Sequence, residues 1–208
     1  MPQLSQAKTM GGVGAILLLL GFVPAVGWVL SIAGGVLILI AVKYISEIVS
    51  DPAIFRNMIL AVVLAIVGLV VGVAVVISTV FSTLGLPATF GGFGGLGAFS
   101  PPANIPPGDW VHLISGILAG LAVVWILLIV SALFVRRSYG SMASKLGVPM
   151  FGTAGLLYLI GAALTIVLVG FILILIGEIL NVVAFFSIPE QQPQTQQSQP
   201  VQTPPSLA

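Results

Sequence analysis

The chain has 208 residues, of which 59% are apolar and only 5% charged, with a net charge of +1. A soluble domain carries about 25% charged residues because its surface faces water, so this composition predicts an integral membrane protein. No cysteine and a single histidine, His112, exclude thiolate, iron–sulfur and bis-histidine haem sites within one chain, and the near-neutral charge argues against a nucleic-acid partner.

The first part of the chain contains three apolar segments, and a membrane-spanning helix needs about 20 apolar residues. We expect the first two helices over about residues 7–23 and 27–49, separated at Pro24, which interrupts helices. The first segment, with Lys8 before its apolar stretch, also resembles a secretory signal, and that alternative stays open. A third helix is predicted over about 52–84, where Asp51 suits the N-cap and Pro52 the first helical position.

Residues 85–109 form the longest predicted connection. Their density of glycine and proline forbids a regular helix, and they carry no charge before Asp109. Asp109 is a plausible N-cap for a fourth helix over about 110–139. Arg136 and Arg137 then lie in its last turns, where cations interact favourably with the helix dipole.

The last apolar block covers about residues 149–188. As one helix it would be about 60 Å long, twice the hydrocarbon thickness of a bilayer, so we divide it into helices at about 149–164 and 168–188. Residues 189–208 contain seven glutamines and five prolines and predict a disordered tail, with a partner-binding tail as the alternative. The predicted fold is an all-α integral membrane bundle of six transmembrane helices, with a Gly/Pro-rich outer loop and a disordered C-terminal tail.

All the cations fall on one side of this six-helix topology, together with both termini: Lys8, Lys43, Arg56, Arg136, Arg137 and Lys145. The positive-inside rule therefore predicts a multi-pass protein of the cell membrane with both termini in the cytoplasm and these residues as topology anchors. Trp28 and Trp110 are expected together at the outer interface, where indole rings are favoured.

Small residues at intervals of four predict close helix packing. Gly68 and Gly72 form one such pair in the third helix, and Gly116 and Gly120 form another in the fourth. We expect these four glycines to pack within one chain; a seam between two copies is the alternative.

Glu178 is the one carboxylate predicted deep in the membrane, close to its midplane, and Asn181 shares its helix face. An ionisable group at that depth is costly unless it is protonated or paired. Glu178 is then either a structural acid, hydrogen-bonded to a neighbouring helix or paired with Lys43, or the centre of a proton- or cation-linked site. We interpret Trp125 and Tyr158, which lie mid-helix, as packing or lipid-facing residues.

The sequence contains none of the serine-hydrolase, zinc-protease or P-loop motifs. We therefore expect no enzyme activity, no catalytic residue, no metal site and no cofactor. The favoured function is an accessory or interaction subunit of a membrane assembly; the alternative is a small proton- or cation-linked transporter or channel that uses Glu178 and Asn181. The expected partners are the lipid bilayer and either other membrane subunits or a second copy of the chain.

Four short segments resemble one family: Leu4–Gly12, Ala41–Ser46, Ile54–Asn57 and Ala184–Ile188. They are similar to the small, mostly archaeal integral membrane proteins grouped as domain of unknown function family 996. The resemblance covers about residues 4–188 and omits the central loop and the tail. It implies a multi-helix membrane protein with no assigned activity, so it transfers no catalytic residue to this chain.

Overall fold

A computed structural model describes residues 4–83 and 107–189 of the chain, and all the regular structure in these ranges is helical. Six of the helices are long and apolar enough to cross a membrane. They are α1 (Leu4–Leu19), continued by the 3-10 turn η1 (Leu20–Phe22), α2 (Gly27–Ile48), α3 (Pro52–Thr83), α4 (Pro107–Leu146), α5 (Pro149–Leu164), followed by the 3-10 turn η3 (Thr165–Val167), and α6 (Val169–Phe186).

Local chemistry explains several of the helix ends. The side chain of Asp51 accepts a hydrogen bond from the backbone N–H of Ala53 at 3.1 Å, so α3 begins directly after an acidic cap. α5 begins at Pro149, whose missing N–H costs nothing in a first turn. The turn that we placed near residues 164–170 is present at 165–168, where Leu168 adopts a positive φ of 61°. The last apolar block is therefore two helices.

α4 is longer than predicted at both ends. It begins at Pro107 rather than near 110, so Asp109 lies in its first turn and is not the N-cap. It continues past 139 to Leu146 because Tyr139, Met142 and Leu146 repeat at helical spacing and are all buried. The helix ends where Gly147 adopts a positive φ of 69°.

Two smaller differences concern the termini and the loop. α1 begins at Leu4 rather than near residue 7, and α6 ends at Phe186. Apart from the residues that join α4, the predicted outer loop lies outside the described residues, and so does the predicted tail from residue 190 onward.

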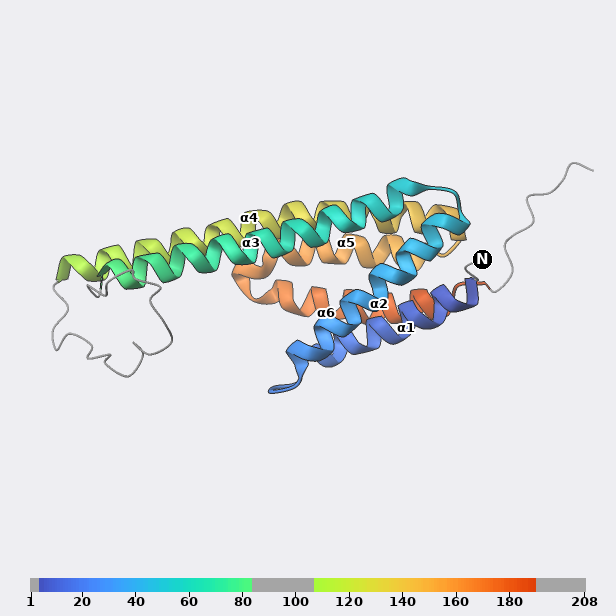
Figure 1. The fold of residues 1–208 in the computed structure, drawn as a ribbon, viewed down its shortest axis with the longest axis horizontal. Helices are drawn as coiled ribbons and strands as arrows, with labels where there is room; N and C mark the ends of the chain where they lie inside the picture. Colours follow the sequence, from blue (N-terminus) through green and yellow to red (C-terminus); the bar gives the residue numbers. More distant parts are fainter. Residues whose placement is uncertain (1–3, 84–106, 190–208) are drawn as a thin grey trace, which may run out of the picture.

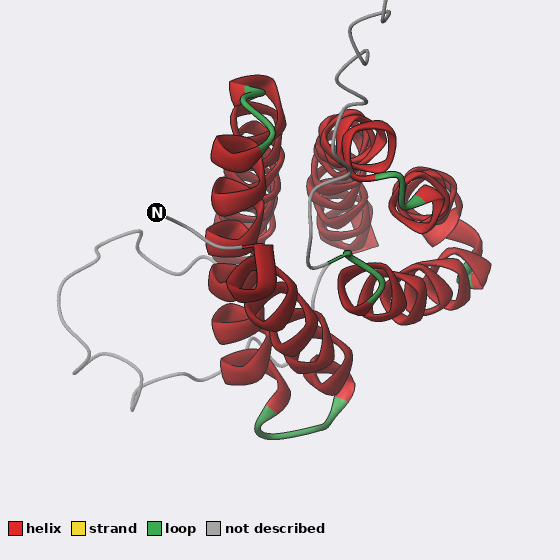
Figure 2. Cartoon of the chain, turned by 90° about the vertical axis from the view of Figure 1, so that its right-hand side faces the viewer, coloured by secondary structure: helices red, strands yellow, loops and turns green. Residues whose placement is uncertain are grey.

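The helices form three antiparallel hairpins, α1/α2, α3/α4 and α5/α6 (Figure 1). The middle hairpin packs α4 against α5, α1 packs against α6, and α2 meets α3 beside the connecting turn. The start of α1 and the turns at 49–51 and 147–148 lie at the same end of the molecule (Figure 1), which we call the charged end. Viewed onto this end, the N-terminal hairpin is inclined to the other helices (Figure 2).

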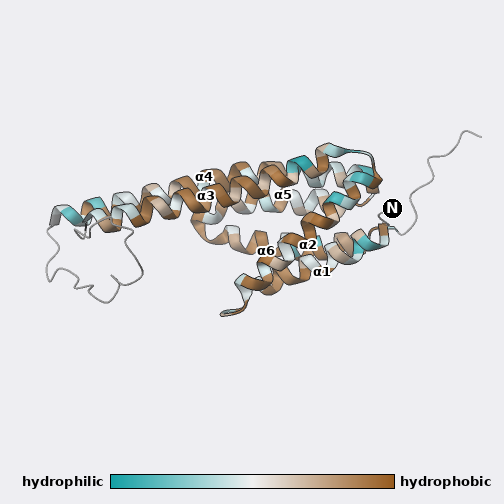
Figure 3. Cartoon of the chain, in the orientation of Figure 1, coloured by the Kyte–Doolittle hydropathy of each residue, from teal (hydrophilic) through white to brown (hydrophobic). Residues whose placement is uncertain are grey.

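The hydrophobic core lies near the charged end. Its largest fully buried apolar side chains lie on α2 to α6, apart from Ile188, which follows α6. They are Ile45, Ile54, Met142, Phe151, Phe185 and Ile188. Away from the charged end the three hairpins diverge, and most of their surface between that end and the polar tips of α3 and α4 is apolar (Figure 3). Leu69 of α3 and Leu118 of α4, for example, are 59% and 60% exposed. In a membrane, lipid or another protein would cover these faces.

The four predicted packing glycines lie in the seam between α3 and α4 of the same chain. A Cβ on Gly72 would lie 2.9 Å from the backbone oxygen of Gly120, and the reverse distance is the same. Gly68 faces Leu127, and Gly116 faces Thr79. The two backbones therefore approach each other too closely to leave a passage between them.

Candidate functional site

Glu178 and Asn181 lie on α6 and meet two tyrosines from neighbouring helices. Asn181 is fully buried. The Glu178 carboxyl group lies within electrostatic range of the Tyr158 hydroxyl on α5 and of the Asn181 amide, and Tyr139 of α4 lies within the same range of Glu178 and Asn181. The rings of Tyr139 and Tyr158 are 6.1 Å apart. We call these four residues the polar cluster.

Four buried side-chain atoms in the polar cluster have no hydrogen-bond partner among the described residues. They are the Tyr158 hydroxyl oxygen, Glu178 Oε2, and both Asn181 Nδ2 and Asn181 Oδ1. A buried polar group left unpaired costs about 1–3 kcal/mol, and such groups normally have a partner. The same groups also interact with one another electrostatically, and their concentration at one place makes the polar cluster the candidate site for water, a proton or an ion.

The structure does not bring Lys43 to this cluster. Its Nζ lies 3.9 Å from a carboxylate oxygen of Glu47, one turn along α2, and both side chains are about half exposed. The separation follows from the packing order, because α1 rather than α2 lies against α6. An ion pair between Lys43 and Glu178 is therefore absent from this fold.

Contacts along the helices place the polar cluster close to the level of Arg136. Gly177 packs against Tyr158, since a Cβ on this glycine would lie 3.3 Å from the tyrosine ring. A Cβ on Gly155, one turn from Tyr158, would lie 3.1 Å from Arg136 Cα. Glu178 therefore lies about one helical turn from the level of Arg136. Glu178 lies about half-way along α6, which runs from Val169 to Phe186, and its depth in the membrane stays a prediction.

Aromatic rings separate the cluster from the charged end. Phe151 lies 5.6 Å from Tyr139 and 5.0 Å from Phe185, in edge-on arrangements. Both phenylalanines are fully buried, and Gly11 of α1 packs directly on the Phe185 ring. These rings form a low-dielectric layer, so charge in the polar cluster is poorly screened by water.

Sequence reasoning did not assign the two tyrosines to the site. Tyr158 was interpreted as a packing or lipid-facing residue, and Tyr139 was placed at a helix end. A usable signal was present, because a tyrosine inside an apolar helix brings a hydroxyl group that needs a partner. Trp125 shows the same rule satisfied, since its indole N–H donates to the backbone oxygen of Ala162 at 3.1 Å.

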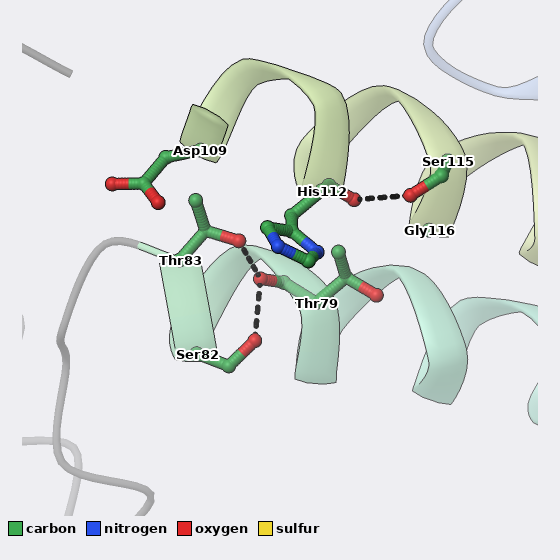
Figure 4. A pocket seen from close by; sticks show the side chains of 7 residues that line it. All are labelled: Thr79, Ser82, Thr83, Asp109, His112, Ser115 and Gly116. Atoms are coloured by element: carbon green, nitrogen blue, oxygen red, sulfur yellow. Dashed lines mark hydrogen bonds between the residues drawn. The ribbon is translucent and has the colours of Figure 1, made fainter. Parts of the chain in front are cut away.

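Apart from the polar cluster, a hollow lies between the ends of α3 and α4 that are remote from the charged end (Figure 4). It is lined by Thr79, Ser82, Thr83, Asp109, His112, Ser115 and Gly116. The hydroxyl groups of all four serine and threonine residues donate to backbone oxygens of their own helix, and His112 is exposed. No group of three acidic or histidine side chains suited to a metal occurs in the described part of the chain.

The cationic residues predicted as topology anchors gather near the charged end. Lys8 lies in the first turns of α1, Arg56 in the first turns of α3, and Lys145 in the last turn of α4. Arg136 and Arg137 lie ten and nine residues before the end of α4, and the Arg137 guanidinium lies 5.5 Å from the centre of the Phe134 ring.

Comparison with known proteins identifies the family. A family model described as "Protein of unknown function (DUF996)" matches residues 30–179. An uncharacterized protein of Methanocaldococcus jannaschii is 35% identical over 188 residues, which cover 90% of this chain and 94% of the relative. No solved structure matches the chain. Both matches extend over most of the sequence, and the chain belongs to the DUF996 family of proteins of unknown function.

Proposed function

We propose that this protein is a proton- or cation-linked membrane protein whose ion-binding site is the polar cluster. The observation that supports the proposal is the set of four buried polar atoms without partners on Tyr158, Glu178 and Asn181. One carboxylate, one amide oxygen and phenolic oxygens provide hard donors of the kind that protons and hard cations prefer. A single carboxylate balances a single positive charge, which favours a proton or a monovalent cation.

The proposal concerns binding first and transport second. The cluster lies near the charged end, and beyond it α3 and α4 approach closely at Gly72 and Gly120, which leaves no route between these two helices. An ion path across the rest of the membrane would then need a second chain or another subunit. Binding by the isolated chain is therefore the direct test, and flux is the test of the larger assembly.

The deciding experiment compares Glu178→Gln with Glu47→Gln in nanodiscs. Both changes remove one carboxylate, but Glu47 is half exposed on α2, outside the cluster. We measure binding of radioactive sodium and follow the infrared band of a protonated carboxyl group during a pH titration. Wild type and Glu47→Gln should show sodium binding or the carboxyl band, and Glu178→Gln should lose it. Unchanged signals in a folded Glu178→Gln protein would contradict the proposal.

Flux provides the second readout. We reconstitute the wild type and the same two variants into proteoliposomes and impose a proton or sodium gradient. Gradient-dependent flux that persists unchanged in Glu178→Gln would remove this carboxylate from any transport mechanism. Flux that is absent from every variant, together with site-specific binding, would assign the cluster to sensing rather than to transport.

A second candidate function is a non-enzymatic accessory or interaction subunit with both termini in the cytoplasm. The observation in its favour is the divergence of the hairpins, which leaves apolar faces such as that of Leu118, 60% exposed, without a covering helix. Extraction into nanodiscs from the native membrane, followed by native mass spectrometry, tests it. Foreign subunits in fixed stoichiometry would support this function, and a chain that emerges alone would count against it.

A further inference from the structure

The three hairpins differ in how far they extend from the cationic residues of the charged end. In α3, 27 residues separate Arg56 from Thr83, and the same number separate Asp109 from Arg136 in α4. At 1.5 Å per residue each distance is about 40 Å. This length matches a whole bilayer with its interfacial regions, so α3 and α4 are long enough to place Arg136 and Asp109 at opposite surfaces.

The other two hairpins are much shorter when measured from their own cationic residues or, for α5/α6, from the level of Arg136. Only 14 residues separate Lys8 from Phe22, and 16 separate Gly27 from Lys43, which correspond to about 21 Å and about 24 Å. In the third hairpin, 12 residues lead from Gly155, which packs beside Arg136, to Val167, or about 18 Å. The α1/α2 hairpin is also inclined (Figure 2), which shortens its reach further.

The apices of the short hairpins therefore stop well before the remote end of α3 and α4 (Figure 1). Both apices have the chemistry of lipid-facing segments. Val26 at one apex is 54% exposed, and Leu168 at the other is 73% exposed. Residues 20–27 and 166–171 contain no charged or polar side chain, whereas the tips of α3 and α4 carry Thr83, Asp109 and His112.

Part of the backbone at both apices is internally hydrogen-bonded, which lowers the cost of a turn in hydrocarbon. At the first apex Val23 N–H donates to Leu20 O at 3.0 Å and Gly27 N–H to Val23 O at 2.9 Å. At the second, Leu168 N–H donates to Thr165 O at 3.1 Å. These bonds reduce the number of unpaired backbone groups that each turn would expose to hydrocarbon.

We infer that α1/α2 and α5/α6 are re-entrant hairpins that enter from the charged end and turn within the hydrocarbon, so that the protein acts as a wedge in one leaflet. Six helices then occupy the leaflet at the charged end, and only α3 and α4 continue through the other. With a helix diameter of about 10 Å, four helices add several hundred Å² of cross-section to one leaflet. Such asymmetry favours membranes that are convex on the charged side. The inference is independent of the ion site.

The first experiment locates the apices in the membrane. The chain has no cysteine, so each single-cysteine variant carries one label. Val26→Cys and Val167→Cys mark the two apices, Thr83→Cys marks the remote tip, and Glu47→Cys marks the charged end. In sealed vesicles a membrane-impermeant maleimide should label Thr83→Cys from one side and Glu47→Cys from the other. The apex variants should react only after detergent is added, and spin labels there should show high oxygen and low nickel accessibility.

The contrary result is equally specific. Labelling of Val26→Cys and Val167→Cys from the same side as Thr83→Cys, and to the same extent, would show that these hairpins reach the far surface. The bilayer would then thin around short spanning helices, and the inference would be overturned. Four labelling sites on different elements ensure that one misfolded variant does not decide the result.

The second experiment measures the wedge itself. A fluorophore on Glu47→Cys reports protein density on single vesicles of different size, and an impermeant quencher identifies the vesicles whose charged end faces outward. Protein density in this orientation should rise several-fold from large to small vesicles. Equal density at all sizes, with deeply buried apices, would overturn the wedge and leave only the re-entrant topology.

Discussion

The side chain of Asn181 is the most informative single group in the molecule, because it is fully buried and neither amide atom has a partner in the described residues. Replacement by leucine, which has the same branched shape and a larger volume, removes an unpaired polar group whose burial costs about 1–3 kcal/mol. We therefore expect Asn181→Leu to raise the midpoint of thermal unfolding in nanodiscs and to abolish ion binding at the polar cluster.

Two comparisons make this prediction discriminating. Asn181→Ala removes the same amide but leaves a cavity, so its unfolding midpoint should fall below that of Asn181→Leu. A midpoint for Asn181→Leu well below the wild-type value, without added ions, would mean that the amide already has a stabilising partner. The site would then be a closed structural network, as in the alternative that the sequence left open for Glu178.

Ser138 is a buried polar residue whose hydroxyl group has a hydrogen-bond partner. It is fully buried, and its hydroxyl donates to the backbone oxygen of Ile54 across the α3–α4 interface at 2.9 Å. Hydrogen bonds between helices in a membrane contribute about 0.6 kcal/mol on average, so Ser138→Ala should lower the unfolding midpoint slightly. Ser144→Ala is the matched control, because its exposed hydroxyl bonds only to Ser141 in its own helix; equal effects of the two changes would contradict the interpretation.

At the scale of elements, adjacent glycines of α2 differ sharply in their surroundings. A Cβ on Gly34 would lie 2.6 Å from the backbone oxygen of Gly14 in α1, whereas a Cβ on Gly35 would meet nothing within 4 Å. Gly34→Ala should therefore force α1 and α2 apart and lower the unfolding midpoint. Gly35→Ala should be neutral or slightly stabilising, because alanine favours helix by about 1 kcal/mol over glycine. A circular-dichroism melt of both variants measures the difference, and similar melts would refute the close contact.

Much of the helical order could be predicted from the sequence, and the reasons are local. Apolar runs bounded by Pro24, Pro52 and Pro149 give the helix starts and turns, and the length of the last run required a turn near Leu168. The end of α4 could not be predicted in this way, because its last two turns depend on burial of Met142 and Leu146 against other helices. The polar cluster was predicted only in part for the same reason. Glu178 and Asn181 share one helix, but the two tyrosines lie on α4 and α5 and join the cluster only through the packing of these helices.

At the scale of the whole molecule, the sequence does not show how far one hairpin extends relative to another. Trp28 and Trp110 each lie at the start of an apolar helix, and the sequence predicts both at the outer membrane interface. The structure separates them, since Trp28 lies at the apex of the short α1/α2 hairpin and Trp110 at the remote tip of α4 (Figure 1). Both side chains are exposed, at 68% and 52%, so each would report the lipid around it.

This separation gives a prediction that needs no added label. In variants that retain Trp28 or Trp110 alone, with the other tryptophans changed to phenylalanine, fluorescence is quenched by lipids brominated at chosen depths. Trp28 should be quenched most by lipids brominated deep in the acyl chain, and Trp110 most by those brominated near the headgroup. Trp125, packed between helices through its bond to Ala162, should be quenched less than Trp28. If Trp28 and Trp110 gave the same depth profile, the short hairpins would reach the far interface, and all six helices would cross the bilayer in full.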